Sequence, residues 1–151
     1  MPDANRLDTV HESIAALQRL SELLQQRRQQ LARRVGLSEQ QWRVLEEIST
    51  DQFMPSLFAK SRESSAAAVS KVLRQLLDKE LVRVSVSSDD GRQRQYELSS
   101  KGQRAIDRVG RERKRAIDAI WRDLPEGDLK RFNQLSTELI ARIERFATED
   151  A

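Results

Sequence analysis

Residues 55–98 read PSLFAKSRESSAAAVSKVLRQLLDKELVRVSVSSDDGRQRQYEL, and the order of segments within this stretch decides the fold. We expect a short helix, a polar turn, a second helix and two strands, at 55–60, 61–65, 66–79, 81–87 and 92–98. Pro55 suits the first turn of a helix, where its missing N–H would have no partner. Val82, Val84 and Val86 alternate with other residues, which is typical of a strand. Two helices followed by a hairpin give the order of a winged helix-turn-helix domain.

The second helix of this stretch has a polar start and an apolar inner side. Either Ser64 or Ser65 can act as its N-cap. Its buried stripe is expected at Val69, Val72 or Leu73, Leu76 and Leu77. Between the strands, residues 88–91 read SDDG, and an Asp-Gly pair at such a place is a strong hairpin signal.

Long helices flank this centre on both sides. Apolar residues recur at helical spacing within 7–35, which predicts one helix of about 25 residues. Gly36 suits a left-handed cap at its end, and Ser38 and Gln41 can form a capping box for a helix reaching about Ile48. Ser99 or Ser100 can cap a helix from Lys101 to about Trp121, and a last helix follows the break at 124–127.

Each of these flanking helices carries an apolar stripe. The first stripe is Val10, Ile14, Leu17, Leu20, Leu24 and Leu31, and the second is Trp42, Leu45 and Ile48. The residues expected to face inward after the hairpin are Ile106, Val109, Ile117, Ile120 and Trp121, then Leu129, Phe132, Leu135, Leu139, Ile143 and Phe146.

The predicted fold is mainly α with a small β-hairpin wing: a winged helix-turn-helix with long N- and C-terminal dimerisation helices. We place an N-terminal dimerisation helix at 1–36, the winged domain at 37–100, and C-terminal dimerisation helices at 101–151. The stripes of the terminal helices are too long for the winged domain to cover. We therefore expect a homodimer that buries them.

Composition excludes several classes of function. The 151 residues contain no Cys and a single His, which removes disulfides, thiolate chemistry and most metal sites. No nucleophile–base pair and no phosphate-cradling Gly loop is visible, so we expect no enzyme and no cofactor. No apolar run approaches the roughly 18 residues of a membrane span, and no signal peptide opens the chain. We expect a soluble cytoplasmic protein.

The winged stretch has the residues that DNA binding requires. Residues 60–94 hold eight Lys or Arg against five Asp or Glu, a net charge of +3. The formal net charge of the whole chain is also +3. Small residues at the start of the second helix let its backbone approach base edges in the major groove. These are Ser64, Ser65, Ala66, Ala67 and Ala68, while Ser70, Lys71 and Arg74 lie within reach of bases or phosphates. Arg92 and Arg94, beside the hairpin tip, suit the DNA backbone or the minor groove.

These segments together resemble the MarR family of bacterial transcription regulators. The similarity runs from about Leu37 to Gly102. It rests on the order of Leu37–Leu45, Val69–Leu73 with Leu76 and Lys79, Leu81-Val82, Asp90-Gly91-Arg92, and Leu98-Ser99-Ser100-Lys101-Gly102.

The resemblance implies a homodimer with interlocking terminal helices that represses transcription from a palindromic operator. It also implies release by a small ligand, often phenolic or an aromatic acid. Ser65–Arg74 would then be the recognition helix, Arg92 the wing residue in the minor groove, and Asp90 the acid that steadies the wing. Around the effector we place His11, Trp42 and Arg43, although Trp42 also suits plain core and His11 a plain surface.

The sequence departs from the family pattern at three places. Glu80 stands where a Gly usually ends the recognition helix, and Arg62 stands where an apolar residue is common. The connection between Trp42 and Phe58 is short, so we expect a reduced leading strand.

Two alternatives stay open: a DNA-binding regulator without a small-molecule effector, and a helical scaffold or interaction protein. Arg92 also has a competing role, which is to pair with Asp90 and shape the wing.

Overall fold

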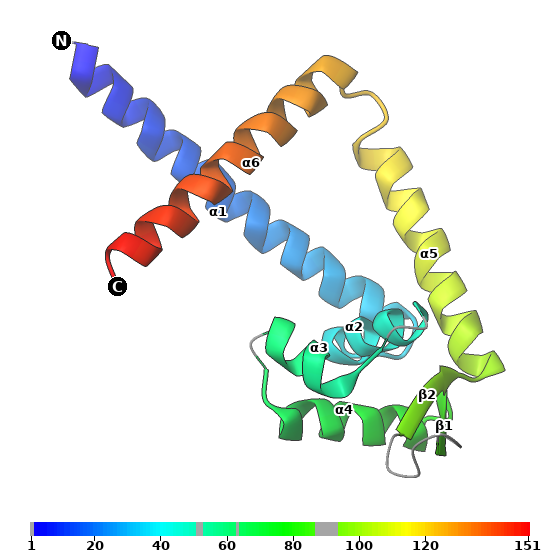
Figure 1. Cartoon of the computed structure of the whole chain (residues 1–151). Coiled ribbons are helices and arrows are strands. Elements are labelled where there is room, and N and C mark those ends of the chain that lie inside the picture. Colours follow the sequence, from blue (N-terminus) through cyan, green and yellow to red (C-terminus); the bar gives the residue numbers. More distant parts are fainter. Residues whose placement is uncertain (1, 51–52, 63, 87–93) are drawn as a thin grey trace. The chain divides into compact units, whose positions relative to one another are not determined.

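The computed structural model describes residues 2–50, 53–62, 64–86 and 94–151 (Figure 1). Its elements are α1 (Pro2–Arg34), α2 (Glu39–Ile48), α3 (Pro55–Ser61), α4 (Ala66–Asp78), β1 (Val82–Val86), β2 (Arg94–Leu98), α5 (Ser100–Ile120) and α6 (Glu126–Glu149). The prediction of a mainly α chain with one β-hairpin is confirmed. The chain divides into two compact units, residues 1–113 and 114–151, and α5 runs across their boundary.

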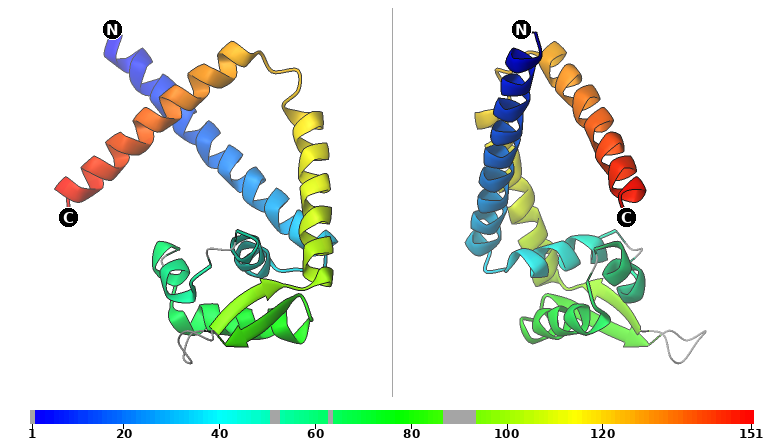
Figure 2. Two further views of the ribbon diagram at one scale, coloured as in Figure 1. Left: turned by 45° about the vertical axis from the view of Figure 1, so that its right-hand side comes forward. Right: turned by 90° about the vertical axis from the view of Figure 1, so that its left-hand side faces the viewer.

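In the first unit, α2, α3, α4 and the hairpin gather at the C-terminal end of α1 (Figure 2). Gly36 ends α1 with φ of 75°, and the Leu37 N–H donates to the Ala32 carbonyl at 2.9 Å. A residue with positive φ is the usual device for ending a helix, and Gly takes it without a Cβ penalty. The predicted cap is confirmed, and α1 itself begins earlier than expected, at Pro2.

The predicted capping box at the start of α2 is present. The Gln41 N–H donates to Ser38 Oγ at 3.1 Å, and the Ser38 N–H donates to Gln41 Oε1 at 3.1 Å. This fixes where α2 begins and therefore which residues face inward. Trp42, Leu45 and Ile48 are all buried, as the spacing predicts.

The choice between two caps for α4 is also settled. Ser65 Oγ accepts the Ala68 N–H at 3.0 Å, whereas the Ser64 N–H donates to the Ala59 carbonyl at 2.8 Å and closes the turn after α3. With Ser65 as N-cap, the buried stripe of α4 is Val69, Val72, Leu73 and Leu76, with Leu77 half-buried.

The core lies between α2, α4, the hairpin and the ends of α1 and α5. Trp42, Leu45, Ile48 and Leu76 are its largest fully buried side chains. Each such side chain contributes about 1.5–3 kcal/mol by leaving water. These contacts fix α4 on α2, so the outer face of α4 is presented to solvent.

Strands β1 and β2 pair antiparallel, with Val82 opposite Leu98, Val84 opposite Tyr96 and Val86 opposite Arg94. Among the described residues the sheet contains these two strands and no leading third one. Val82 is buried, but Val84 and Val86 become progressively exposed. The hairpin therefore extends beyond the core toward its tip.

The inward positions expected in the last two helices are partly wrong for the single chain. Val109 is buried and Ile106 half-buried, but Ile117 and Ile120 are exposed. The reason is that only the first part of α5 packs against the winged core, and the periodic stripe continues beyond it. In α6, likewise, no residue is buried, and Phe132, Leu135, Ile143 and Phe146 are exposed.

The end of α4 holds a non-Gly residue in the left-handed region. Glu80 has φ of 60°, at the position where the family pattern has Gly. The left-handed conformation costs a residue with a Cβ about 1–2 kcal/mol. We expect Glu80→Gly to raise the free energy of unfolding by about 1 kcal/mol, measured by urea denaturation. Glu80→Ala keeps the Cβ and is the control, so an equal gain in Glu80→Ala would contradict this explanation.

Candidate nucleic-acid interface

The outer face of α4 is small at its start and basic further along. Ala66, Ala67, Ser70, Lys71 and Arg74 are all exposed. They lie on one side of the helix because residues three and four apart share a face. The opposite side carries the buried stripe, so packing against the core orients this face outward.

The beginning of this face is open to a close approach. Ser64, Ser65 and the three alanines that follow are exposed, and none has a side chain longer than a hydroxymethyl group. A major groove about 12 Å wide admits a helix, and small side chains at this end let the helix backbone come near the bases.

The cationic part of the face is available to phosphate. Lys71 and Arg74 are exposed, and neither makes an ion pair with another described residue. An Arg suits bidentate contact with guanine or phosphate, and a Lys acts as a point charge. The face thus combines small side chains with exposed cations, which are the features that groove binding requires.

Of the predicted wing residues, Arg94 is described, whereas Asp90 and Arg92 lie outside the described residues. Arg94 begins β2, is exposed and pairs across the ladder with Val86. Because side chains alternate along a strand, Arg94 shares a face with Tyr96, which is half-buried against the core, and it lies nearer the hairpin tip.

A polar junction, formed by Gln41, Gln75, Lys79 and Lys101, holds the C-terminal end of α4. Lys79 Nζ donates to the Gly36 carbonyl at 2.9 Å and to Gln41 Oε1 at 2.8 Å. Gln41 Nε2 donates to Gln75 Oε1 at 2.9 Å, and Lys101 Nζ donates to the Lys79 carbonyl at 2.9 Å. The junction thus connects α4 to the α1–α2 link and to the start of α5.

Sequence reasoning missed the polar junction. The sequence pattern indicates only a capping role for Gln41, whereas its 7% exposure indicates a second role. A capping-box amide has further donors and acceptors, and burial requires them to find partners. The need to pair the remaining groups of the Gln41 amide is therefore the one sequence signal that points to the polar junction.

Removing the ammonium of the polar junction should destabilise the fold. Lys79→Met keeps the stem but deletes charged hydrogen bonds of the kind worth about 1.5–3 kcal/mol, so we expect a loss of about 2 kcal/mol in urea denaturation. Lys71→Met is the matched control, because Lys71 is exposed and should change stability by less than about 0.5 kcal/mol. An unchanged midpoint for Lys79→Met would show that the junction does not position α4.

The three candidate effector residues do not come together in one chain. Trp42 is 1% exposed, with the Arg28 guanidinium 4.3 Å and the Arg113 guanidinium 5.8 Å from its ring centre. His11 is exposed on α1, about 25 Å along the helix from Arg28 at a rise of about 1.5 Å per residue. Arg43 pairs with Glu39 at 2.7 Å and lines a cavity that does not include Trp42.

Other kinds of site find no support in the part of the chain that the structure describes. No group of three or more His, Cys, Asp and Glu residues there is placed to hold a metal ion. The same residues form no helix of the length and hydropathy that a bilayer span requires.

A helix with an exposed, small and basic face, set on two others and followed by a hairpin, defines a winged helix-turn-helix domain. No protein-family model and no curated protein matches the chain. Solved structures do match, and MarR family transcription regulators are among them. The chain therefore has the fold of that family.

Three of these structures illustrate the likeness. A crystal structure of a MarR family transcription regulator superposes with a TM-score of 0.85 at 14% identity, over 97% of each chain. YusO from Bacillus subtilis gives 0.69 at 20% identity, over 89% of this chain and 96% of that one. Staphylococcus aureus MepR, in a complex with DNA, gives 0.68 at 17% identity, over 85% and 94%.

Proposed function

We propose that this protein is a sequence-specific transcriptional regulator of the MarR type, not an enzyme. It binds a palindromic operator as a homodimer, represses transcription there and leaves the DNA when a small ligand binds. The single observation that carries the proposal is the outer face of α4, where exposed small residues are followed by Lys71 and Arg74, which form no ion pair with another described residue. The DNA complex of MepR, which shares the fold, supports it.

The residues of the interface have distinct proposed roles. Ser64, Ser65, Ala66 and Ala67 admit the helix to the groove, and Ser70, Lys71 and Arg74 contact bases or phosphates. Arg92 and Arg94 contact the DNA from the wing, with Asp90 steadying it. The winged domain at 37–100 is the DNA-binding part, and the segments 1–36 and 101–151 make the dimer.

DNA selection tests the proposal directly. We expect the full chain to enrich a palindromic sequence from a pool of random duplexes. Its affinity should fall steeply with salt, since each phosphate contact adds about 0.9 to the slope of log K against log salt. A protein that enriches no sequence and shows a flat salt dependence would be a scaffold and not a regulator.

The homodimer is proposed because α1 exposes an apolar stripe. Val10, Ile14 and Leu17 are each more than 40% exposed in the single chain, and they share a face with Leu20 and Leu24. Stable obligate interfaces bury about 2,000 Å² or more, and two such stripes can supply a surface of that kind. Sedimentation equilibrium should show a dimer at micromolar concentration.

A pair of neighbouring substitutions makes the dimer test specific. Ile14→Glu puts a charge into the stripe and should shift the protein toward monomer. Ala15→Glu changes the charge equally but lies on the side of α1 away from the stripe, so it should leave the dimer unchanged. A monomeric wild-type chain, or equal effects of both substitutions, would contradict the proposed interface.

A further inference from the structure

Three arginines of α5, Arg104, Arg108 and Arg111, form a row along one side of the helix. They are four and three residues apart, which places them on one face. At a rise of about 1.5 Å per residue, this arginine row is about 10 Å long. All three residues are exposed, and they belong to the first compact unit, which ends at Arg113.

The arginine row faces away from the winged core. Gly102 and Val109 are the buried residues of α5. Val109 comes five residues after Arg104 and two before Arg111, and residues at these spacings point to different sides of a helix. Packing against the core therefore does not account for the three arginines.

Ion pairing among the described residues does not account for them either. Asp107 is the one acidic residue within 101–111, and its Oδ1 accepts the Gln103 amide N–H at 3.0 Å. None of the three guanidinium groups forms a hydrogen bond or an ion pair with another described residue.

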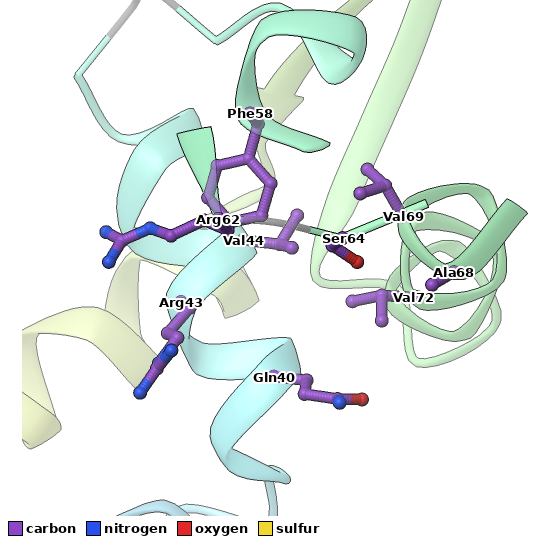
Figure 3. Close-up of a pocket in the computed structure, with 9 residues that line it drawn as sticks. All are labelled: Gln40, Arg43, Val44, Phe58, Arg62, Ser64, Ala68, Val69 and Val72. Atoms are coloured by element: carbon purple, nitrogen blue, oxygen red, sulfur yellow. The ribbon is translucent and has the colours of Figure 1, made fainter. Parts of the chain in front are cut away.

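Other arginines of the first unit do pair with carboxylates. Arg43, which lines a cavity between α2, α3 and α4 (Figure 3), pairs with Glu39 at 2.7 Å. Arg113 of α5 pairs with Glu46 of α2 at 3.0 Å. The arginine row differs from these residues because no described carboxylate neutralises its charge.

This concentration of charge suits a polyanion. Helix α5 holds seven Lys or Arg against three Asp or Glu, so its net charge of +4 exceeds the +3 of the whole chain. Like charges three and four residues apart repel each other, and an anion along the row would relieve that repulsion. The planar fork of a guanidinium fits two oxygens of one phosphate. One DNA strand places a phosphate about every 3.4 Å along the axis, so the row spans about three of them.

The arginine row and the outer face of α4 lie on different sides of the winged core. In both views of Figure 2, the first part of α5 leads away from the hairpin, on the side opposite to α4. The outer face of α4 points away from the core, because the other side of that helix carries the buried stripe. A straight duplex that lies against α4 therefore leaves the arginine row uncovered.

We propose that the arginine row binds the phosphate backbone of a second DNA duplex, without reading its sequence, while α4 holds the operator. Binding of the backbone by the row stands by itself, whereas simultaneous occupancy rests on the proposed function. A homodimer would carry two such rows, so it would hold two segments of DNA together.

A bridging assay with the full-length protein tests the proposal. The selected operator duplex is fixed to a surface and saturated with protein, and unbound protein is washed away. A labelled duplex of unrelated sequence is then added. We expect the bound protein to capture the label, with an affinity that falls steeply as salt rises, because phosphate contacts release counterions.

Two variants make the assignment specific. The row variant combines Arg104→Gln, Arg108→Gln and Arg111→Gln. The control variant combines Arg19→Gln, Arg131→Gln and Arg145→Gln, which remove the same charge from exposed sites on α1 and α6. We expect the row variant to bind the operator normally but to capture at least tenfold less of the second duplex, whereas the control variant should capture as much as wild type. Circular dichroism and sedimentation confirm that each variant is folded and dimeric.

A second comparison needs no operator. Lys71→Gln with Arg74→Gln removes the cations from the outer face of α4. The resulting protein should still bind the unrelated duplex in solution. Adding the three substitutions of the row variant should weaken that binding at least tenfold, because the arginine row would then be its main contact.

Each result decides one part of the proposal. Equal capture by the row and control variants would overturn the site. Loss of the dimer in the row variant would make the row a contact between protomers and would overturn it as well. Binding of phosphatidylglycerol vesicles without capture of duplex would overturn DNA as the occupant. Failure to select any operator would overturn the proposed function, while the comparison without operator would still decide the row.

Discussion

Ala67→Glu is expected to abolish specific DNA binding while the dimer stays folded. Ala67 is exposed on the first turn of α4, on the face proposed to enter the major groove. Glutamate there adds volume where the backbone must come close, and it places a negative charge near phosphates. Like charges brought together in an interface cost several kcal/mol. At about 1.4 kcal/mol per tenfold, affinity for the selected operator should fall by about two orders of magnitude or more.

Titration of labelled operator duplex measures this effect. Ala15→Glu is the matched control, since it makes the same change at an exposed position on α1 and should leave the affinity as it was. Thermal unfolding and sedimentation of both variants check that fold and dimer are retained. Normal operator binding by Ala67→Glu would mean that another face of α4, or another element, meets the DNA.

Gly102→Ala is expected to lower the free energy of unfolding by about 3 kcal/mol, at the upper end of the cost of overpacking a core. Gly102 is buried in the first turn of α5, and a Cβ built on it would lie 2.0 Å from the Leu81 carbonyl oxygen. That carbonyl accepts the Ser99 N–H at 3.0 Å, so it cannot move without breaking the contact between the hairpin and α5. Close packing against the Leu81 carbonyl therefore explains why the family-like Leu98–Gly102 motif ends in Gly.

Gly110→Ala in the same helix is the matched control for this change. A Cβ at Gly110 meets nothing within 4 Å. An Ala in a helix interior is favoured over Gly by about 0.5–1 kcal/mol, so this variant should become more stable. Both variants are compared by urea denaturation at the same protein concentration, because the stability of the proposed dimer would depend on concentration. Equal and small changes in the free energy of unfolding for the two variants would show that the contact between the hairpin and α5 can accommodate a Cβ at Gly102.

The local elements could be predicted from the sequence because local chemistry determines them. The capping box of Ser38 and Gln41, the left-handed Gly36 and the helical start at Pro55 each depend on residues a few positions apart. The departure at Glu80 was visible as a missing Gly, and the structure places that residue at positive φ. The outer face of α4 followed from the spacing of its buried stripe.

Features that depend on distant contacts could not be predicted in this way. Periodicity assigns Ile117 and Ile120 to the apolar side of α5, but it cannot say where the core of one chain ends. The polar junction joins Gln41 to Lys79, and no short-range pattern marks such a pair. The cavity behind α4 likewise needs three helices in place before its lining can be recognised.

The polar junction makes the support of α4 unequal along its length. Hydrogen bonds donated by Lys79 and Lys101, and the one that Gln75 accepts from Gln41, collect at its C-terminal end, while its N-terminal half borders a cavity. The polar contacts therefore anchor α4 at one end, beside the α1–α2 link, and the opposite end is the one proposed to meet the DNA. A rotation of a few degrees at the anchored end is magnified over the helix length of about 20 Å, at about 1.5 Å per residue. A small rotation at the anchored end would therefore move the end proposed to meet the DNA by a distance comparable to the tolerance of a hydrogen bond.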